Sequence, residues 1–204
     1  MKAKTLIFIP TYNERENAPR ICAQIQELGL EADLLFMDDN SPDGTGQLLE
    51  ELKGRFPRLL VQHRPGKQGI GSAHFEAITW AYQQGYELVV TMDCDFTHLP
   101  SDVPALLAAA RECDVAVGSR WLQPNSLPGW NLFRRLMTNM GHWLTRRVLG
   151  VPQDASGSFR AYRLDRVPRP LFDLGKARGY VCVVESLFIL NRNGLVIREV
   201  PIVL

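Results

Sequence analysis

Five short apolar runs, separated by helix-like segments, most constrain how this chain can fold. The runs are nearly continuous in Leu, Val, Ile or Phe, which is typical of strands buried on both faces. They cover residues 5–10, 33–38, 59–63, 87–93 and 114–119. Segments between them, such as ENAPRICAQIQELG, place apolar residues at helical spacing and have Gly near their end. This alternation predicts an α/β fold, with right-handed crossovers and an open sheet covered by helices on both faces.

After residue 120 the pattern changes. A basic, amphipathic helical region is expected over 127–150, following a Pro/Gly turn, and a polar loop leads into a short strand over 151–163. A buried helix with a Gly stop is expected over 182–194, and a last strand over 195–204. Since no long linker or repeat is present, we expect one domain.

The composition excludes several classes of protein. The 204 residues suffice for one domain with a substantial core, and the formal net charge of +1 gives no general attraction for nucleic acid. No stretch approaches the roughly 20 apolar residues that span a bilayer, and the first apolar run is too short for a signal peptide. The four cysteines form no CxxC pair. They indicate reduced thiols in a cytoplasmic protein.

Polar residues follow the first two predicted strands, where ligands of open α/β sheets bind. The first strand is followed by neither GxGxxG nor GxxxxGK[ST], so the phosphate-binding turns of Rossmann and P-loop proteins are missing. Tyr12 could stack on a base and Glu14 could accept a hydrogen bond from one, or the segment only starts a helix. Asp38 and Asp39 are adjacent carboxylates that repel each other, and a donor such as a ribose hydroxyl would relieve this repulsion. The residues that follow them are typical of an ordinary turn.

The third and fourth predicted strands add a basic and an acidic group. Arg64 and Lys67 lie in a loop with three glycines that suits a phosphate, although a basic turn explains it equally well. On an extended chain, Asp93 and Asp95 point to the same side and could hold one cation. Carboxylate oxygens suit Mg²⁺ or Mn²⁺. For His98 a structural hydrogen bond is favoured over metal ligation.

Several segments resemble family 2 glycosyltransferases with the GT-A fold, in order and in spacing: PTYNERENAP, MDDNSPDGT, KQGIGSA, MDCDFTHLP and GSRW. Within that family the chain looks closest to polyprenol (dolichol) phosphate mannose synthases, over about residues 4–203. The resemblance implies an open, mixed, mainly parallel sheet in a single domain, 1–204, with a nucleotide-sugar half (1–120) and an acceptor half (121–204). It also implies metal-dependent, inverting transfer of mannose from GDP-mannose to a polyprenyl phosphate.

The resemblance, together with the loop positions above, assigns roles to individual residues. The residues expected to hold the nucleotide are Pro10, Tyr12, Glu14, Asp39 and Lys67. Those expected to hold Mg²⁺ or Mn²⁺ are Asp93, Asp95 and Thr97. Those expected to hold the acceptor phosphate are Arg120, Arg134, Thr138 and Arg160. Among all of these, the residues expected to act in catalysis are Asp95, Arg120 and Arg134.

The chain also departs from the family pattern. Relatives often have Gln where this chain has Thr97, Ala where it has Cys94, and SGFR where it has SGSFR, residues 156–160. Glu185 falls at the family's GYxFxxE glutamate. Relatives continue beyond the last strand into a segment that covers the donor, so a chain ending at Leu204 is expected to lack this C-terminal lid.

The acceptor half contains many arginines and few acids. Between residues 120 and 160 the only acid is Asp154, whereas the arginines are Arg120, Arg134, Arg135, Arg146, Arg147 and Arg160. A hydroxyl acceptor needs a general base, whereas a phosphate monoester, with a second pKa of about 6, is already largely dianionic. The balance therefore favours a phosphate acceptor, oriented by arginines.

The amphipathic region has two interpretations. It could be an ordinary core helix, or it could lie on a membrane surface through Trp130, Phe133, Leu136 and Trp143, alone or with a membrane-anchoring partner. The second interpretation predicts a peripheral protein at the cytoplasmic face of the membrane.

Two other functions remain open. One is a family 2 transferase that uses UDP-glucose or another nucleotide sugar, and the other is a non-catalytic module that binds a nucleotide sugar or a lipid phosphate. A Rossmann oxidoreductase is disfavoured by the missing GxGxxG.

Overall fold

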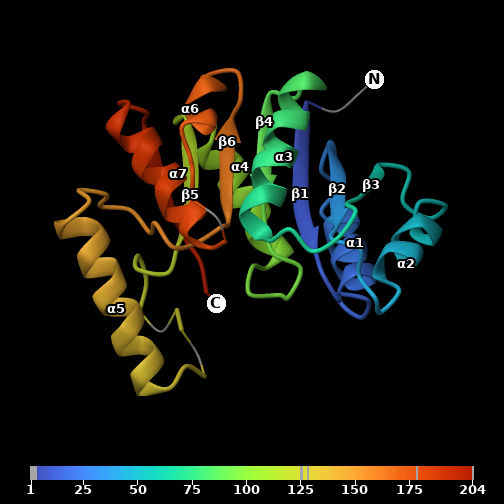
Figure 1. The fold of residues 1–204 in the computed structure, drawn as a ribbon, viewed down its shortest axis with the longest axis horizontal. Helices are drawn as coiled ribbons and strands as arrows, with labels where there is room; N and C mark the ends of the chain where they lie inside the picture. The colour runs from blue at the N-terminus through green and yellow to red at the C-terminus, as the bar shows by residue number, and fades with distance from the viewer. Residues whose placement is uncertain (1–3, 125, 128, 178, 204) are drawn as a thin grey trace.

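A computed structural model describes residues 4–124, 126–127, 129–177 and 179–203. Pro128 of the predicted Pro/Gly turn and Leu204 of the predicted last strand therefore lie outside the described residues. The structure has an open seven-stranded sheet with strand order β3-β2-β1-β4-β6-β5-β7 (Figure 1). The strands are β1 (Thr5–Thr11), β2 (Ala32–Asp38), β3 (Leu59–His63), β4 (Leu88–Thr91), β5 (Val115–Ser119), β6 (Arg160–Arg163) and β7 (Ile197–Pro201).

The sheet is mixed and mainly parallel, as predicted. Only β6 runs antiparallel, to β4 on one side and to β5 on the other. All five apolar runs form strands, and the short strand expected near residue 160 is the antiparallel one. β4 ends at Thr91, two residues before the predicted end. Asp93 and Asp95 thus lie in a loop, and the premise that they sit on an extended strand is wrong.

Helices cover both faces of the sheet because successive strand residues point to opposite faces. Ile7 and Ile9 of β1 pack with residues of α1, α2 and α4, whereas Leu6 and Phe8 pack with α3 and α7. Figure 1 shows α3 and α7 in front of the sheet and α4 behind it. The helices are α1 (Ala18–Glu27), α2 (Thr45–Leu52), α3 (Ile70–Gln83), the short 3₁₀ helix η1 (Pro100–Asp102), α4 (Val103–Ala109), α5 (Leu132–Arg147), α6 (Pro170–Asp173) and α7 (Val181–Arg192).

All four thiols are free, and three of them are buried. No helix within the described ranges is both long enough and apolar enough to span a bilayer.

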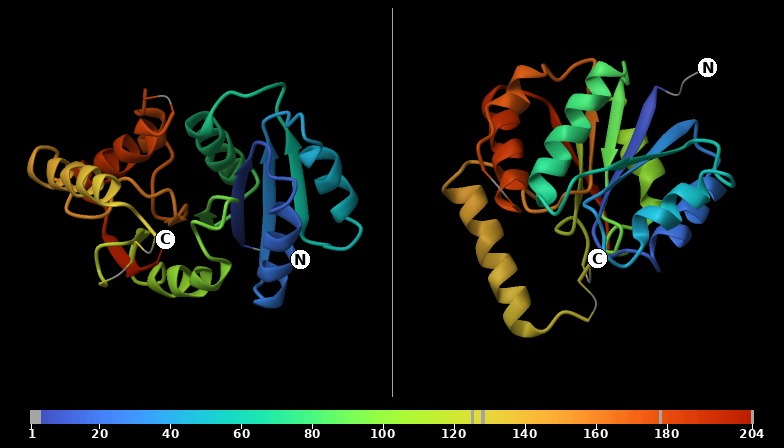
Figure 2. Two further views of the ribbon diagram at one scale, coloured as in Figure 1. Left: turned by 90° about the horizontal axis from the view of Figure 1, so that it is seen from below. Right: turned by 45° about the vertical axis from the view of Figure 1, so that its right-hand side comes forward.

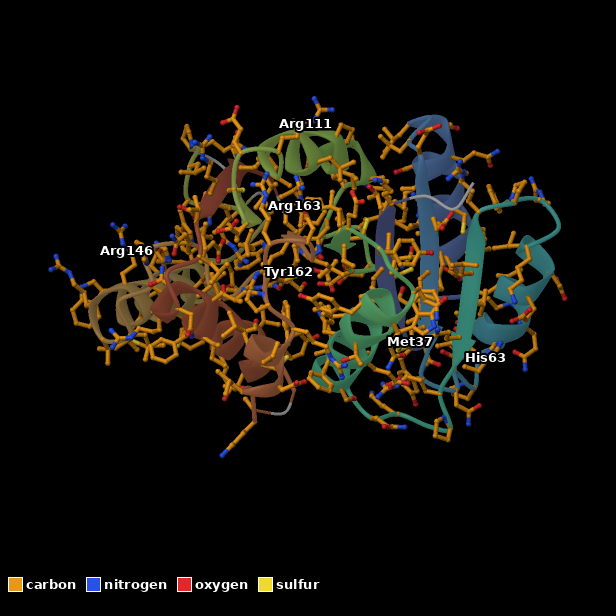
Figure 3. All side chains as sticks on the ribbon, turned by 90° about the horizontal axis from the view of Figure 1, so that it is seen from above. Met37, His63, Arg111, Arg146, Tyr162 and Arg163 are labelled. Carbon is orange, nitrogen blue, oxygen red and sulfur yellow. The ribbon has the colours of Figure 1, made fainter. Side chains whose placement is uncertain are left out.

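Helix α5 differs from the others because none of its residues is buried. Leu132 is 83% exposed, Phe133 71% and Leu136 60%, so the apolar side chains face outwards. Figures 1 and 2 show α5 projecting from the sheet. In Figure 3, Arg146 on α5 lies at the opposite end of the molecule from Met37 and His63. The interpretation of this region as a core helix is therefore wrong.

Candidate active site

The carboxyl ends of β1, β2 and β4 meet at one edge of the sheet, the lower edge in Figure 1. In register, Thr11 at the end of β1 pairs with Asp38 at the end of β2. The loops that follow these strands carry the predicted nucleotide and metal residues, so parallel pairing brings distant parts of the sequence together.

The two carboxylates at the end of β2 each have their own donors within the protein. Asp38 accepts hydrogen bonds from the Ser41 N–H at 3.0 Å and the Ser41 hydroxyl at 2.5 Å. Asp39 forms a buried ion pair with Arg64 and accepts from the N–H groups of Gln68 (3.0 Å) and Gly69 (3.2 Å). A ligand is therefore not needed to relieve their repulsion. Asp39 anchors the Gly-rich loop, and its contact with a nucleotide stays a prediction.

Tyr12 and Lys67, both predicted to bind the nucleotide, lie together. The Lys67 ammonium is 4.0 Å from the centroid of the Tyr12 ring, a cation–π distance. Pro10, half-buried in β1, precedes them. Asn13 adopts a left-handed φ of 62°, and its N–H donates to the Ser41 hydroxyl at 3.0 Å. This turn holds the β1 loop against the β2 loop.

Asp93 is oriented by two neighbours and has one carboxylate oxygen without a partner. The Ser158 hydroxyl donates to Oδ2 at 2.9 Å, and the Asp93 N–H donates to His98 Nδ1 at 3.0 Å. The His98 ring stacks on Phe159, with centroids 5.0 Å apart. His98 therefore has the structural role that was favoured. Oδ1 of Asp93 is buried and has no hydrogen-bond partner among the described residues.

Asp95 lies in a tight turn and is exposed. Its Oδ1 accepts hydrogen bonds from the Thr97 N–H at 3.0 Å and the Thr97 hydroxyl at 2.6 Å. Phe96 between them has φ 62°, which closes the turn. The Thr97 hydroxyl thus points to the carboxylate, and its ligation of a metal stays a prediction.

Glu14 adds a third carboxylate to this acidic region. Burial raises the pKa of Glu14, a hydrogen bond from Asn17 opposes the rise, and the charges of Asp95 and Asp93 add to it. A divalent cation would relieve this repulsion and satisfy the orphaned oxygen of Asp93. No group of three or more His, Cys, Asp or Glu arranged for a metal is found in the described part of the chain. The orphaned oxygen of Asp93 and the nearby carboxylates of Asp95 and Glu14 fit a cation with few protein ligands, as Mg²⁺ prefers.

Arg120 is buried and held by Asp154, the single acid of the Arg-rich region. Its Nε donates to Asp154 Oδ2 at 2.8 Å. Arg120 Nη2 would lie 3.4 Å from a Cβ added at Gly157, so the guanidinium packs against that glycine. The loop 154–159 therefore contacts both Arg120 and Asp93. Gly157 packs against Arg120, and the following residue, Ser158, donates to Asp93.

Arg160, also predicted to bind the acceptor phosphate, makes its hydrogen bonds within the protein. Its side chain is fully buried, and it donates to the Ala155 carbonyl at 2.8 Å and the Ser186 hydroxyl at 3.1 Å. These contacts tie the 154–159 loop to α7. The position supports a structural role for Arg160.

Arg134 and Thr138 lie on α5. The Arg134 guanidinium stacks over Trp130, 3.7 Å from the ring centroid, and the Asn131 side chain caps the helix by accepting from the Arg134 N–H at 2.8 Å. Thr138 is half-buried, on the side of α5 that faces the rest of the protein.

A cavity of about 600 Å³ lies between α3 and α7, and the sequence analysis missed it. Ser158 lines it and also binds Asp93, so the cavity borders the acidic region. His74 lines it too, and burial lowers the pKa of His74 to about 3. Glu185, the residue noted in GYxFxxE, lines it and accepts from the Lys176 and Ala177 N–H groups. Glu185 was the one signal that pointed here.

Gly71, the last of the three glycines that follow β3, lies in the first turn of α3. An added Cβ would lie 2.7 Å from the Cys182 sulfur and 2.9 Å from the Gly179 carbonyl oxygen. The absence of a side chain at Gly71 therefore lets the start of α7 pack closely against α3.

Comparison with known proteins identifies the family. Residues 6–167 match the family model described as "Glycosyl transferase family 2". The chain belongs to glycosyltransferase family 2. This transferase is 35% identical over 200 residues to an undecaprenyl-phosphate mannosyltransferase of Micrococcus luteus, covering 98% of this chain and 82% of the relative. It is also 35% identical to a polyprenol monophosphomannose synthase of Mycolicibacterium smegmatis, covering 98% and 76%. The expected enzyme class, a hexosyltransferase, is confirmed.

Solved structures confirm the fold of the family 2 transferase. Glucosyl-3-phosphoglycerate synthase from Mycobacterium tuberculosis superposes with a TM-score of 0.69 at 20% identity, covering 98% of this chain and 70% of that one. The mannosyltransferase PcManGT from Pyrobaculum calidifontis, solved with GDP-Man and Mn²⁺, gives a TM-score of 0.61 at 18% identity, covering 98% and 55%.

Proposed function

We propose that this family 2 transferase moves mannose from GDP-mannose to a polyprenyl phosphate, with a divalent cation and with inversion at the anomeric carbon. One observation carries the proposal. Consecutive residues of one loop, Gly157 and Ser158, contact Arg120 and Asp93 respectively. A site for an anionic acceptor at Arg120 and a site for a cation at Asp93 would therefore lie side by side.

The donor half of the site would hold the nucleotide. Tyr12 offers an aromatic face and Lys67 a positive charge for the diphosphate. Glu14 adds an acceptor for a base or ribose donor. The names of the two mannosyltransferase relatives, and the GDP-Man bound in the Pyrobaculum enzyme, support mannose and GDP.

Asp93 and Asp95 would hold Mg²⁺ or Mn²⁺. The unpartnered Oδ1 of Asp93 and the exposed carboxylate of Asp95 are hard oxygen ligands, which these ions prefer. When bound, the cation supplies positive charge to neutralise the departing diphosphate. The Ser158 hydroxyl holds the Asp93 carboxylate in place, and His98 Nδ1 holds the Asp93 backbone by accepting from its N–H.

The acceptor half would bind a phosphate monoester. Arg120 and Arg134 would orient the phosphate, and Thr138 would add a hydroxyl. Because the phosphate is already ionised, no general base is required. One of its oxygens attacks the anomeric carbon in line, the new C–O bond forms as the bond to the GDP oxygen breaks, and the configuration inverts. Arg160 is fully buried and donates to the Ala155 carbonyl of the loop 154–159, and its contact with the phosphate stays a prediction.

Helix α5 would meet the membrane surface. Its apolar side chains are exposed and its basic residues lie on the same helix, as in helices that lie at a bilayer interface. Arg134 and Thr138 on that helix would then meet the phosphate of a lipid embedded in the cytoplasmic leaflet. A peripheral location follows from this part of the proposal.

A panel of labelled nucleotide sugars, offered with a short polyprenyl phosphate, tests the donor. We expect transfer from GDP-mannose that EDTA abolishes and Mg²⁺ or Mn²⁺ restores. Transfer from UDP-glucose in place of GDP-mannose would contradict the proposed donor, and full transfer in EDTA would contradict the role of the cation.

A further inference from the structure

Helix α5 contacts the rest of the protein through one narrow face. Its half-buried residues are Thr138, Gly141, His142 and Thr145, and its remaining residues are exposed. Spacings of three and four residues place these four on one side of a helix. The helix is therefore attached along a single line.

On that line, His142 stacks on Trp121. The ring centroids are 4.3 Å apart and the planes differ by 15°. Trp121 directly follows Arg120, and its indole nitrogen is buried with no hydrogen-bond partner among the described residues. The stack therefore joins α5 to the chain segment that carries the buried Arg120–Asp154 pair.

The stack also fixes which way the acceptor residues of α5 face. Thr138 precedes His142 by four residues, which puts it on the same side of the helix, and Arg134 lies one turn further towards the start of the helix. At 1.5 Å per residue, Thr138 is about 6 Å and Arg134 about 12 Å along the axis from His142. Rotation of α5 about its axis would change the direction in which both residues face relative to Arg120.

We propose that His142 is a positioning residue for the acceptor. Its stack on Trp121 sets the rotation and distance of α5, so that Arg134 and Thr138 complete a phosphate site begun by Arg120. This inference rests on the proposed phosphate acceptor. His142 itself does not touch the lipid phosphate.

The chemistry of the contact makes phenylalanine a good mimic. Burial lowers the pKa of His142, so the imidazole is neutral near pH 7 and contacts Trp121 as an aromatic ring. The charged groups that act on its pKa are Asp154, Arg146, Glu199 and Arg120. A Phe at this position keeps the ring contact and removes the titration.

Calorimetric titration of the purified chain with farnesyl phosphate tests the inference. We expect His142→Ala and Trp121→Ala each to weaken binding roughly fivefold to tenfold, the size of one lost aromatic contact. The double variant should lose no more than either single variant, because both remove the same contact. His142→Phe should bind like the wild type. So should Met140→Ala, an apolar truncation on the exposed side of the same helix.

Titration with GDP-mannose separates this effect from general damage. Its affinity should be the same in all five variants, and in assays the KM for the lipid phosphate should rise while the KM for the donor does not. Wild-type affinity for farnesyl phosphate in His142→Ala, loss in His142→Phe, or an equal loss of GDP-mannose affinity would overturn the inference. If His142→Ala does not fold, His142→Leu, which has no ring, replaces it.

Failure of the inference can be told from failure of the proposed function. A wild type that does not bind farnesyl phosphate overturns the inference, whatever the result with GDP-mannose. A wild type that binds farnesyl phosphate through the stack but transfers no sugar contradicts the proposed function alone.

Discussion

At the scale of single residues, the two aspartates of the DCD motif have unlike environments. Asp93 is oriented by Ser158 and His98 and keeps one buried oxygen free, whereas Asp95 is exposed at a turn. A cation held by both would therefore be bound by Asp93, whose carboxylate is already oriented, and by Asp95, whose exposed carboxylate can adjust.

Removing the Ser158 hydroxyl tests whether it orients Asp93 for a cation. We expect Ser158→Ala to weaken Mn²⁺ binding by about tenfold, the low end of the cost of losing a hydrogen bond to a metal ligand. Electron paramagnetic resonance of free Mn²⁺ measures this without turnover. Ser156→Ala is the matched control, because the Ser156 hydroxyl donates to Asp154. Equal Mn²⁺ affinity in the wild type and Ser158→Ala would contradict the assignment.

Asp95→Asn tests whether the Asp95 carboxylate is needed for sugar transfer. The amide keeps the shape but loses the charge that would hold a cation, so we expect kcat/KM to fall by on the order of a hundredfold or more. Farnesyl phosphate affinity should not change, since the acceptor site is on the arginine side. Unchanged turnover in this variant would exclude Asp95 from the cation site.

His74 makes stability depend on pH in the acid range. Its folded-state pKa is lowered by burial from 6.5 to about 3, so below pH 6.5 the unfolded state binds the proton first. The free energy of unfolding should therefore fall as pH drops from 6.5 towards 3, by at most about 1.4 kcal/mol per pH unit from this group. Urea unfolding at several pH values checks this. His74→Gln should show a shallower slope, and an identical slope would assign the effect elsewhere.

At the scale of elements, most of the fold could be predicted from the sequence. Strands buried on both faces appear as continuous apolar runs, and all five were placed correctly. The direction of β6 could not be predicted, because it depends on pairing with β4 and β5, at positions about 70 and 45 residues earlier in the chain. The fate of α5 was also open, since an amphipathic pattern is the same whether its apolar face meets a core or a bilayer.

The exposed face of α5 predicts membrane binding. Phe133→Ser with Leu136→Ser removes two apolar side chains, each worth roughly 1.5–3 kcal/mol when buried, so vesicle affinity should fall by about a hundredfold or more. Flotation with anionic vesicles measures it. The melting temperature should not change, because neither side chain is buried in the protein.

Val196→Ser, an exposed apolar residue outside α5, is the control. It should float with the vesicles like the wild type. Equal flotation of the α5 double variant and the wild type would show that this helix does not contact the bilayer.

At the scale of the whole molecule, the site forms where the carboxyl ends of the parallel strands meet loops from the second half of the chain. Tyr12 and Lys67, both expected at the nucleotide because they follow strands of one sheet, lie beside each other, since parallel strand ends share an edge. The sequence could not show that Arg64 forms an ion pair with Asp39, that Arg160 is buried, or that a cavity lies between α3 and α7. Each of these depends on contacts between residues far apart in the chain, which no local pattern records.

The central claim is that the acceptor is a phosphate and not a hydroxyl. The most direct measurement offers labelled GDP-mannose with Mg²⁺ to the wild type, together with either a short polyprenyl phosphate or the matching polyprenol, and follows label into the lipid phase. Our account predicts label in the polyprenyl phosphate alone, with a product of β configuration by NMR. Label in the free polyprenol, or a product that keeps the α configuration of the donor, would contradict it.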